Sequence, residues 1–87
     1  TSFSLAGRGA KSLEKPSSSS EKEGNVVVEI KVDKYGNVLG AKAGQRGTTL
    51  WNSNLWRLCE QAARKSKFTA NPDALEVQKG TITYIFR

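Results

Sequence analysis

Few residues of this chain have side chains that commonly carry out catalysis. The 87 residues include no histidine and one cysteine, Cys59. Without histidine, proton transfer near neutral pH would need a carboxylate or a lysine with a strongly shifted pKa. The carboxylates of Asp33, Glu60, Asp73 and Glu76 share no fixed spacing and stand in segments typical of a turn, an outer helix face and a loop. The sequence therefore predicts that the chain is not an enzyme.

Cofactor and metal sites are also not expected. A single cysteine forms no intrachain disulfide, and without histidine it provides too few ligands for zinc. Cys59 lies within an apolar helical pattern, where it is expected to be a small core residue. The glycines of Ala6-Gly7-Arg8-Gly9 lack the flanking strand and helix that a phosphate-binding loop needs. We therefore predict no cofactor and no metal.

The net charge of +6 leaves two interpretations open, a solvated surface or an acidic partner such as nucleic acid. A small nucleic-acid-binding module would use Tyr35, Tyr84 and Phe86 as stacking residues. The basic residues are scattered from Arg8 to Arg87 instead of forming one stripe. RNA-binding sheets usually add a second helix and a fourth strand, which the pattern does not predict. Nucleic acid is therefore the alternative partner and not the expected one.

Backbone groups provide a binding site that needs no special side chains. The last apolar segment contains no proline and no charge before Arg87, so it lacks the usual protection of an edge strand. A partner peptide joins such an edge as an additional strand. The alternatives are that another part of the chain, or a second copy in a weak homodimer, covers the same edge. The predicted peptide-binding residues are Thr81, Ile82, Thr83, Tyr84, Ile85 and Phe86.

Two strands and a tight turn are predicted in the first half of the chain. From Gly24 to Asp33, apolar and polar residues alternate, which is typical of a strand with one buried face. Lys34-Tyr35-Gly36-Asn37 is suited to a hairpin turn, because Gly and Asn accept positive φ. A second strand is expected over Val38–Ala43. The Val-rich first strand is expected at the centre of the sheet.

A helix is predicted from Leu50 to Lys67, where apolar residues recur at steps of three and four. Thr48 or Thr49 is the expected N-cap. The apolar stripe is expected to contain Trp51, Leu55, Leu58, Cys59, Ala62 and Ala63. Trp56 falls beside this stripe and is expected either to be partly buried against the N-terminal arm or to mark a contact surface.

These elements predict an α+β fold, a small three-stranded antiparallel sheet in the order β-β-α-β with one main helix on one face. Val38–Ala43 and Thr81–Phe86 are expected at the sheet edges. Residues 1–23 are predicted to be an N-terminal arm and Ser-rich connector, and residues 24–87 the folded domain. The connector is expected either to be disordered or to hold one short helical turn capped by Ser18 or Ser19.

The order of these motifs resembles the C-terminal domain of TonB-family energy transducers, over Gly24 to Phe86. The matching motifs are Gly24-x-Val26-Val27-Val28, Val32-Asp33-Lys34-Tyr35-Gly36-Asn37-Val38, Gln61-Ala62-Ala63, Phe68 before Pro72, and Tyr84-Ile85-Phe86. The upstream Leu5-x-Gly7-Arg8 and Lys15-Pro16 resemble the leader of Bacteroidetes-type members.

The resemblance implies a periplasmic domain, anchored to the inner membrane by an upstream segment. Such domains bind the box peptide of TonB-dependent outer-membrane receptors by strand addition. They transmit work from an ExbB–ExbD complex. By position, Thr81–Phe86 would be the receiving strand. Related domains also end sensor and other envelope proteins not involved in transport, which remains an alternative.

Overall fold

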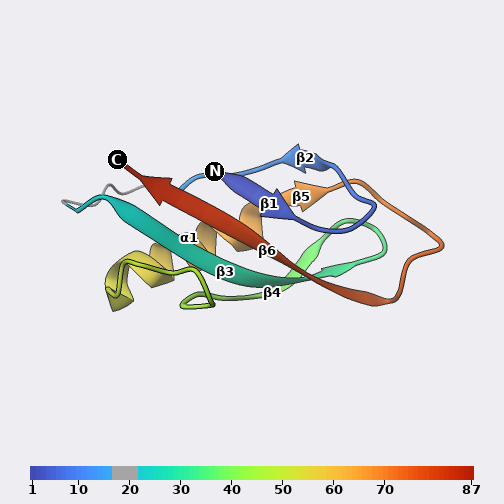
Figure 1. Ribbon diagram of the computed structural model, residues 1–87. Coiled ribbons are helices and arrows are strands. Elements are labelled where there is room, and N and C mark those ends of the chain that lie inside the picture. The colour runs from blue at the N-terminus through green and yellow to red at the C-terminus, as the bar shows by residue number, and fades with distance from the viewer. Residues whose placement is uncertain (17–21) are drawn as a thin grey trace.

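The computed structural model describes residues 1–16 and 22–87, which form one helix and two antiparallel sheets (Figure 1). Strands of the larger sheet lie in the order β1-β6-β3-β4, and β2 pairs with β5 in the smaller sheet. Helix α1 lies across one face of the larger sheet. The elements are β1 (Ser2–Ser4), β2 (Ala10–Ser12), β3 (Gly24–Asp33), β4 (Val38–Lys42), α1 (Ser53–Lys65), β5 (Lys67–Phe68) and β6 (Val77–Phe86).

Strands β3 and β6 form the centre of the larger sheet. They pair without interruption from Gly24 opposite Phe86 to Asp33 opposite Val77. The alternation in β3 confirms the predicted buried face, because its four apolar residues on that side have no exposed surface. On the same face, β6 contributes Ile82 and Tyr84 to the core. The four residues of β3 are Val26, Val28, Ile30 and Val32.

The turn between β3 and β4 is closed by the Asp33 side chain. Its Oδ1 accepts hydrogen bonds from the backbone N–H groups of Tyr35 (3.0 Å) and Asn37 (2.8 Å). The Asn37 hydrogen bond is the main reason that the pKa of the Asp33 carboxyl lies below its ordinary value. Gly36 takes a φ of +92°, as predicted for this turn, and its carbonyl accepts a hydrogen bond from Phe68 N.

Helix α1 begins later than the sequence predicted. Asn52 is the N-cap, and its side chain accepts from the N–H groups of Asn54 and Leu55. Thr48 and Thr49 instead fasten the preceding loop to β3, where their hydroxyls accept from the N–H groups of Val27 and Asn25. The predicted N-cap at Thr48 or Thr49 is therefore wrong, because both hydroxyls are used by the sheet.

The two tryptophans differ in how well their positions were predicted. Trp51 precedes the helix and is 71% exposed, so its predicted place in the apolar stripe is wrong. Trp56 is partly buried as predicted, but against Gly44 and Leu50 where the N-terminal arm was expected. Its Nε1 donates to the Leu50 carbonyl at 2.7 Å. Cys59 is fully buried, which confirms it as a core residue.

The prediction of a three-stranded sheet is corrected by the N-terminal arm. Ser2–Ser4 forms a fourth strand, and Ala10–Ser12 pairs with β5. The described part of the arm contains no helix, and the predicted Ser18 or Ser19 cap lies outside the described residues.

No helix of residues 1–16 and 22–87 has the length and apolar character needed to cross a membrane.

Candidate functional site

The predicted peptide-binding strand is only partly available to a partner. Strand β1 pairs antiparallel with its first half, Ser2 opposite Thr83, Phe3 opposite Ile82 and Ser4 opposite Thr81. Thr81–Thr83 therefore lies between β3 and β1, and the prediction that all of Thr81–Phe86 forms a sheet edge is wrong. Over these three residues another part of the chain covers the edge, which is one of the alternatives that the sequence leaves open.

Strand β1 is held by core packing as well as by strand pairing. Leu5, directly after β1, is 5% exposed, and the Phe3 ring makes an edge-on contact with Phe68 at 5.4 Å between centroids. A Cβ atom at Gly80 would lie 2.5 Å from the Ser4 carbonyl oxygen and 2.8 Å from Leu5 Cδ1. Gly80 thus allows the arm to approach β6 closely, and any larger residue would push it away.

The chain after β1 is fastened by a nearly buried arginine. Arg8 is 7% exposed, and its Nη1 donates to the carbonyls of Asp33 (2.9 Å) and Thr69 (3.0 Å). One guanidinium nitrogen therefore joins the arm to the β3–β4 turn and to the loop after β5. The Gln78 side chain adds a hydrogen bond to the Ala6 carbonyl at 2.8 Å. These contacts make β1 an integral strand of the fold.

The second half of the predicted site, Tyr84–Phe86, is open on the side away from β3. These residues pair with Gly24–Val26, and β1 extends only to the residue opposite Thr83. No other strand of the described chain pairs with Tyr84–Phe86 on that side. Over residues 1–16 and 22–87, the backbone edge of Tyr84–Phe86 therefore has no paired strand, although Thr1 lies beside the same stretch.

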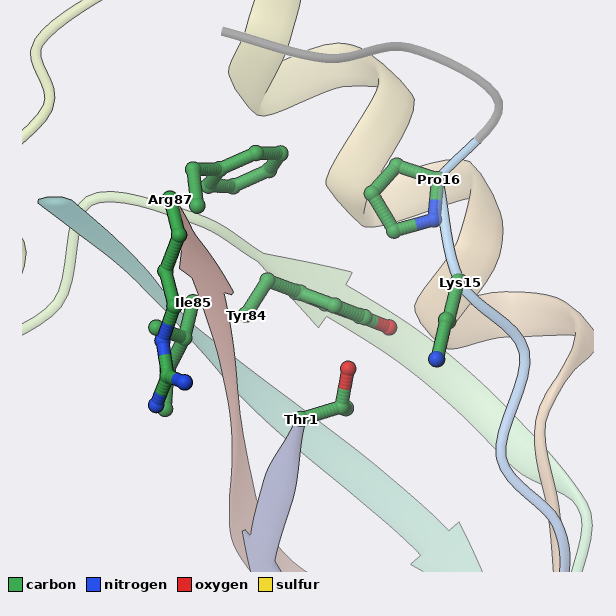
Figure 2. Close-up of a pocket in the computed structure, with 7 residues that line it drawn as sticks. Thr1, Lys15, Pro16, Tyr84, Ile85 and Arg87 are labelled. Atoms are coloured by element: carbon green, nitrogen blue, oxygen red, sulfur yellow. The ribbon is translucent and has the colours of Figure 1, made fainter. Parts of the chain in front are cut away.

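A pocket of about 190 Å³ lies beside this open edge (Figure 2). The arm closes it on the side opposite β6, because Lys15 and Pro16 face the strand across the pocket. The lining residues are Thr1, Lys15, Pro16, Tyr84, Ile85, Phe86 and Arg87. The sequence analysis names Lys15-Pro16 only as part of a leader motif and does not predict its place in the pocket wall, because nothing local in the sequence places it opposite β6.

Tyr84 is the most deeply buried residue that lines this pocket. Its side chain is 1% exposed, and Figure 2 shows the ring extending from β6 with the hydroxyl directed towards Lys15 and Pro16. Within the described residues, no hydrogen bond of good geometry reaches this hydroxyl, although the Ser66 hydroxyl interacts with it. The Ser66 hydroxyl lies near enough to lower the pKa of Tyr84, but burial is the larger effect and raises it. Ser66 Oγ instead donates to the Ala62 carbonyl and accepts from Glu14 N–H.

The opposite edge of the sheet, β4, is less suited to receive a strand. Its pairing with β3 is interrupted by a bulge at Leu39, and the exposed Lys42 lies near its end. The N–H of Ala43, directly after β4, already donates to Glu60 Oε2 at 2.8 Å. Bulges, charges and occupied backbone groups are the features by which proteins protect edge strands from further pairing.

The structure separates the carboxylates that were considered for acid–base chemistry. Asp33 closes a turn and Glu60 receives the Ala43 N–H, while Asp73 and Glu76 lie in or near the loop before β6. In the described residues, no three acidic or cysteine side chains gather as a metal site would require. Burial raises the pKa of the Cys59 thiol to about 11, so little thiolate is present at neutral pH.

The open half of β6 and its pocket therefore form the best-defined candidate site of the described chain. An unpaired backbone edge is a feature to which an extended peptide can be added as a strand. Comparison of the chain with protein-family models, curated proteins and solved structures finds no match.

Proposed function

We propose that this chain is the peptide-binding domain of a TonB-like energy transducer. In this proposal it lies in the periplasm, is anchored to the inner membrane by an upstream segment, and is driven by an ExbB–ExbD complex. It binds the box peptide of an outer-membrane receptor as an added strand. The resemblance of Gly24 to Phe86 motivates the proposal. The observation that carries it is the open backbone edge at Tyr84–Phe86 beside a pocket.

The length of the open edge sets the expected affinity. An edge of three residues forms about two or three backbone hydrogen bonds, each with a net contribution of roughly 1 kcal/mol. One large apolar side chain in the adjacent pocket adds about 1.5–3 kcal/mol. Ordering a flexible peptide removes part of this sum. We therefore expect dissociation constants of about 0.1–1 mM, which suits a contact that must form and release repeatedly.

Strand addition is tested with receptor N-terminal peptides and an isotope-labelled chain. We expect amide shifts in NMR spectra to concentrate on Tyr84–Phe86 and to be absent from β4, the protected edge. Two methylated versions of each peptide provide the decisive comparison, with N-methyl groups on alternate residues in one and on the remaining residues in the other. Only one of them can still donate to β6, because alternate residues of a strand direct their N–H groups to opposite sides.

The two methylated peptides separate strand addition from other binding. Loss of binding with one pattern and retention with the other supports the proposal. Equal binding of both shows that backbone pairing is not used, and no shift on β6 with any receptor peptide removes the proposed site.

Nucleic-acid binding remains the second candidate, and one observation favours it. The sheet has the fourth strand that the sequence did not predict, and its face away from α1 carries the exposed Lys31 and Lys79. Against it, Tyr84 is buried and is not free to stack on a base. Binding of single-stranded oligonucleotides that weakens steeply with salt would support this candidate. Absence of binding at low salt would remove it.

Self-association through the same edge is the third candidate. A second copy that pairs across the open half of β6 would form a weak dimer about a two-fold axis. Sedimentation velocity at several concentrations measures this directly. Competition between dimer formation and receptor peptide would show that both use Tyr84–Phe86.

A further inference from the structure

We propose that the exposed face of α1, together with Trp51, docks on an anionic phospholipid surface. This contact is separate from the open edge of β6 and goes beyond the proposed function. Helix α1 lies across one face of the larger sheet, so its outer side is directed away from the sheet (Figure 1). The exposed residues of the helix are Ser53, Asn54, Arg57, Gln61, Arg64 and Lys65.

The exposed face of α1 carries positive charge that the described chain does not neutralise. Within residues 1–16 and 22–87, the side chains of Arg57, Arg64 and Lys65 form no ion pair and no hydrogen bond. The acidic residue of the helix, Glu60, is only partly exposed, and its carboxylate accepts a hydrogen bond from the Ala43 N–H at 2.8 Å. The helix dipole favours Arg64 and Lys65 in the last turn, but it does not favour Arg57 near the start.

The opposite side of the molecule carries both signs of charge. On the outer face of the larger sheet, Glu29 lies opposite Lys42, and Lys31 lies opposite Lys79. Asp33 is on the same face, two residues after Lys31. Carboxylates therefore lie among the cations of the sheet, whereas the exposed face of the helix carries cations alone. Charge of one sign along one face is complementary to an extended surface of the opposite sign.

Trp51 adds a large aromatic ring at the beginning of the helix. Its side chain is 71% exposed, and it stands two residues before α1. One side of the ring is supported by Trp56, at 5.1 Å between ring centroids. The Trp56 ring is held in turn by the hydrogen bond from its Nε1 to the Leu50 carbonyl at 2.7 Å. An exposed tryptophan beside cations is suited to the boundary between lipid headgroups and acyl chains.

The shape of this face favours a flat partner. Sites for single-stranded nucleic acid are grooves, in which the strand follows a row of cations. The outer side of a helix is convex, and Arg57 and Lys65 are about 12 Å apart along its axis. A helix of this kind lies on a planar lipid surface with its cations among the headgroups and its aromatic ring in the interface. The charges and the ring therefore point to the same partner.

The first test measures binding of the complete 87-residue chain to lipid vesicles. One set contains phosphatidylcholine alone, and the other contains about one third phosphatidylglycerol. We expect at least about tenfold tighter binding to the anionic vesicles, weakening as the salt concentration rises from about 0.05 M to about 0.5 M. Tryptophan emission should shift to shorter wavelength on binding, and a Trp51→Phe variant should lose this shift. Equal binding to both kinds of vesicle, or no shift that depends on Trp51, would overturn the inference.

Two double variants of equal net charge then test which face is used. Replacement of Arg57 and Arg64 by glutamine should weaken binding to the anionic vesicles by about 25-fold, since each cation near such a surface contributes about fivefold. Arginine and glutamine have similar helix propensity, so circular dichroism should show that the fold is retained. Replacement of Lys31 and Lys79 by glutamine is the matched control, because it removes two cations from the opposite side of the molecule. Equal weakening in the two double variants would show that only net charge matters and would refute docking by α1.

Nucleic acid is the competing partner for the same cations. If single- or double-stranded oligonucleotides bind more tightly than anionic vesicles at equal salt, and lose affinity in the variant without Arg57 and Arg64, the lipid proposal is refuted.

Vesicles and receptor peptides separate this inference from the proposed function. Binding to anionic vesicles through α1, without any peptide shift on β6, supports the lipid contact and removes the proposed function. Peptide shifts on β6 without binding to anionic vesicles remove the lipid contact alone.

Discussion

Replacement of Leu5 by alanine tests whether β1 is a fixed strand of the fold or a flap that a peptide displaces. The position of Leu5 after β1, its 5% exposure and its place in the core cluster predict a large loss of stability. Leucine-to-alanine changes at buried sites cost about 2–5 kcal/mol. For a domain of this size, each kcal/mol lowers the midpoint of thermal unfolding by about 4–8 °C.

We therefore expect Leu5→Ala to lower the unfolding midpoint by at least about 8 °C. Circular dichroism during heating measures this change, and a urea titration gives the free energy of unfolding independently. Leu75→Ala is the matched control, because it removes the same atoms from a side chain that is 75% exposed. The control should change stability by no more than about 0.5 kcal/mol.

A Leu5→Ala midpoint within the error of the Leu75→Ala control would refute the packing argument. Strand β1 would then be a loosely attached segment, and all of Thr81–Phe86 would be accessible to a partner. Peptide titrations of the same variant give a second, independent result. If β1 is a fixed strand of the fold, Leu5→Ala should not increase the affinity of the chain for receptor peptides.

Three further predictions concern stability. Gly36→Ala should destabilise the domain by about 3 kcal/mol or more, because φ at Gly36 is +92° and the added Cβ would collide with the Phe68 carbonyl oxygen. Urea unfolding measures the change in the free energy of unfolding, and a decrease below about 1 kcal/mol would contradict the geometry. Burial raises the pKa of Cys59 from 9.0 to about 11, so the stability that this thiol contributes is complete below pH 9 and is lost as the pH rises towards 11. Cys59→Ala should therefore show a smaller alkaline loss of stability than the native chain, and identical pH profiles would exclude this cause. Lys79→Glu should stabilise the domain by about 0.2–1 kcal/mol at low salt, because Lys79 lies directly opposite Lys31 and the change replaces a repulsive pair of charges by an attractive one. Urea unfolding at low and high salt measures this gain, and a gain that persists at high salt would not be electrostatic.

The central part of the fold was predictable because its residues repeat a pattern over a sufficient length. The alternation from Val26 to Val32 identified β3 and its buried face, and the Gly36 turn fixed the hairpin. The apolar stripe of the helix was also predictable, but the residue at which the helix begins was not. Threonine is a common N-cap residue, but in the folded chain the hydroxyls of Thr48 and Thr49 accept hydrogen bonds from backbone N–H groups of β3.

The candidate site was only half predictable, for a related reason. The apolar and β-branched residues of β6 identify a strand, but whether its edge is free depends on a segment about 80 positions away. Ser2–Ser4 is too short to show a period of two, and its pairing with Thr81–Thr83 leaves no local trace. The same holds for Pro16, whose sequence context does not reveal that it lines a pocket together with residues of β6.

The long pairing of β3 with β6 has a mechanical consequence. Ten paired residues extend over about 33 Å, most of the length of a molecule that measures 42 × 21 × 17 Å. Backbone hydrogen bonds lie perpendicular to antiparallel strands. Tension that pulls β3 and β6 past each other along their length loads the whole ladder in shear, so that its bonds must break together. Tension across the strands peels them apart one pair at a time, and the domain therefore resists load along its long axis far better than across it.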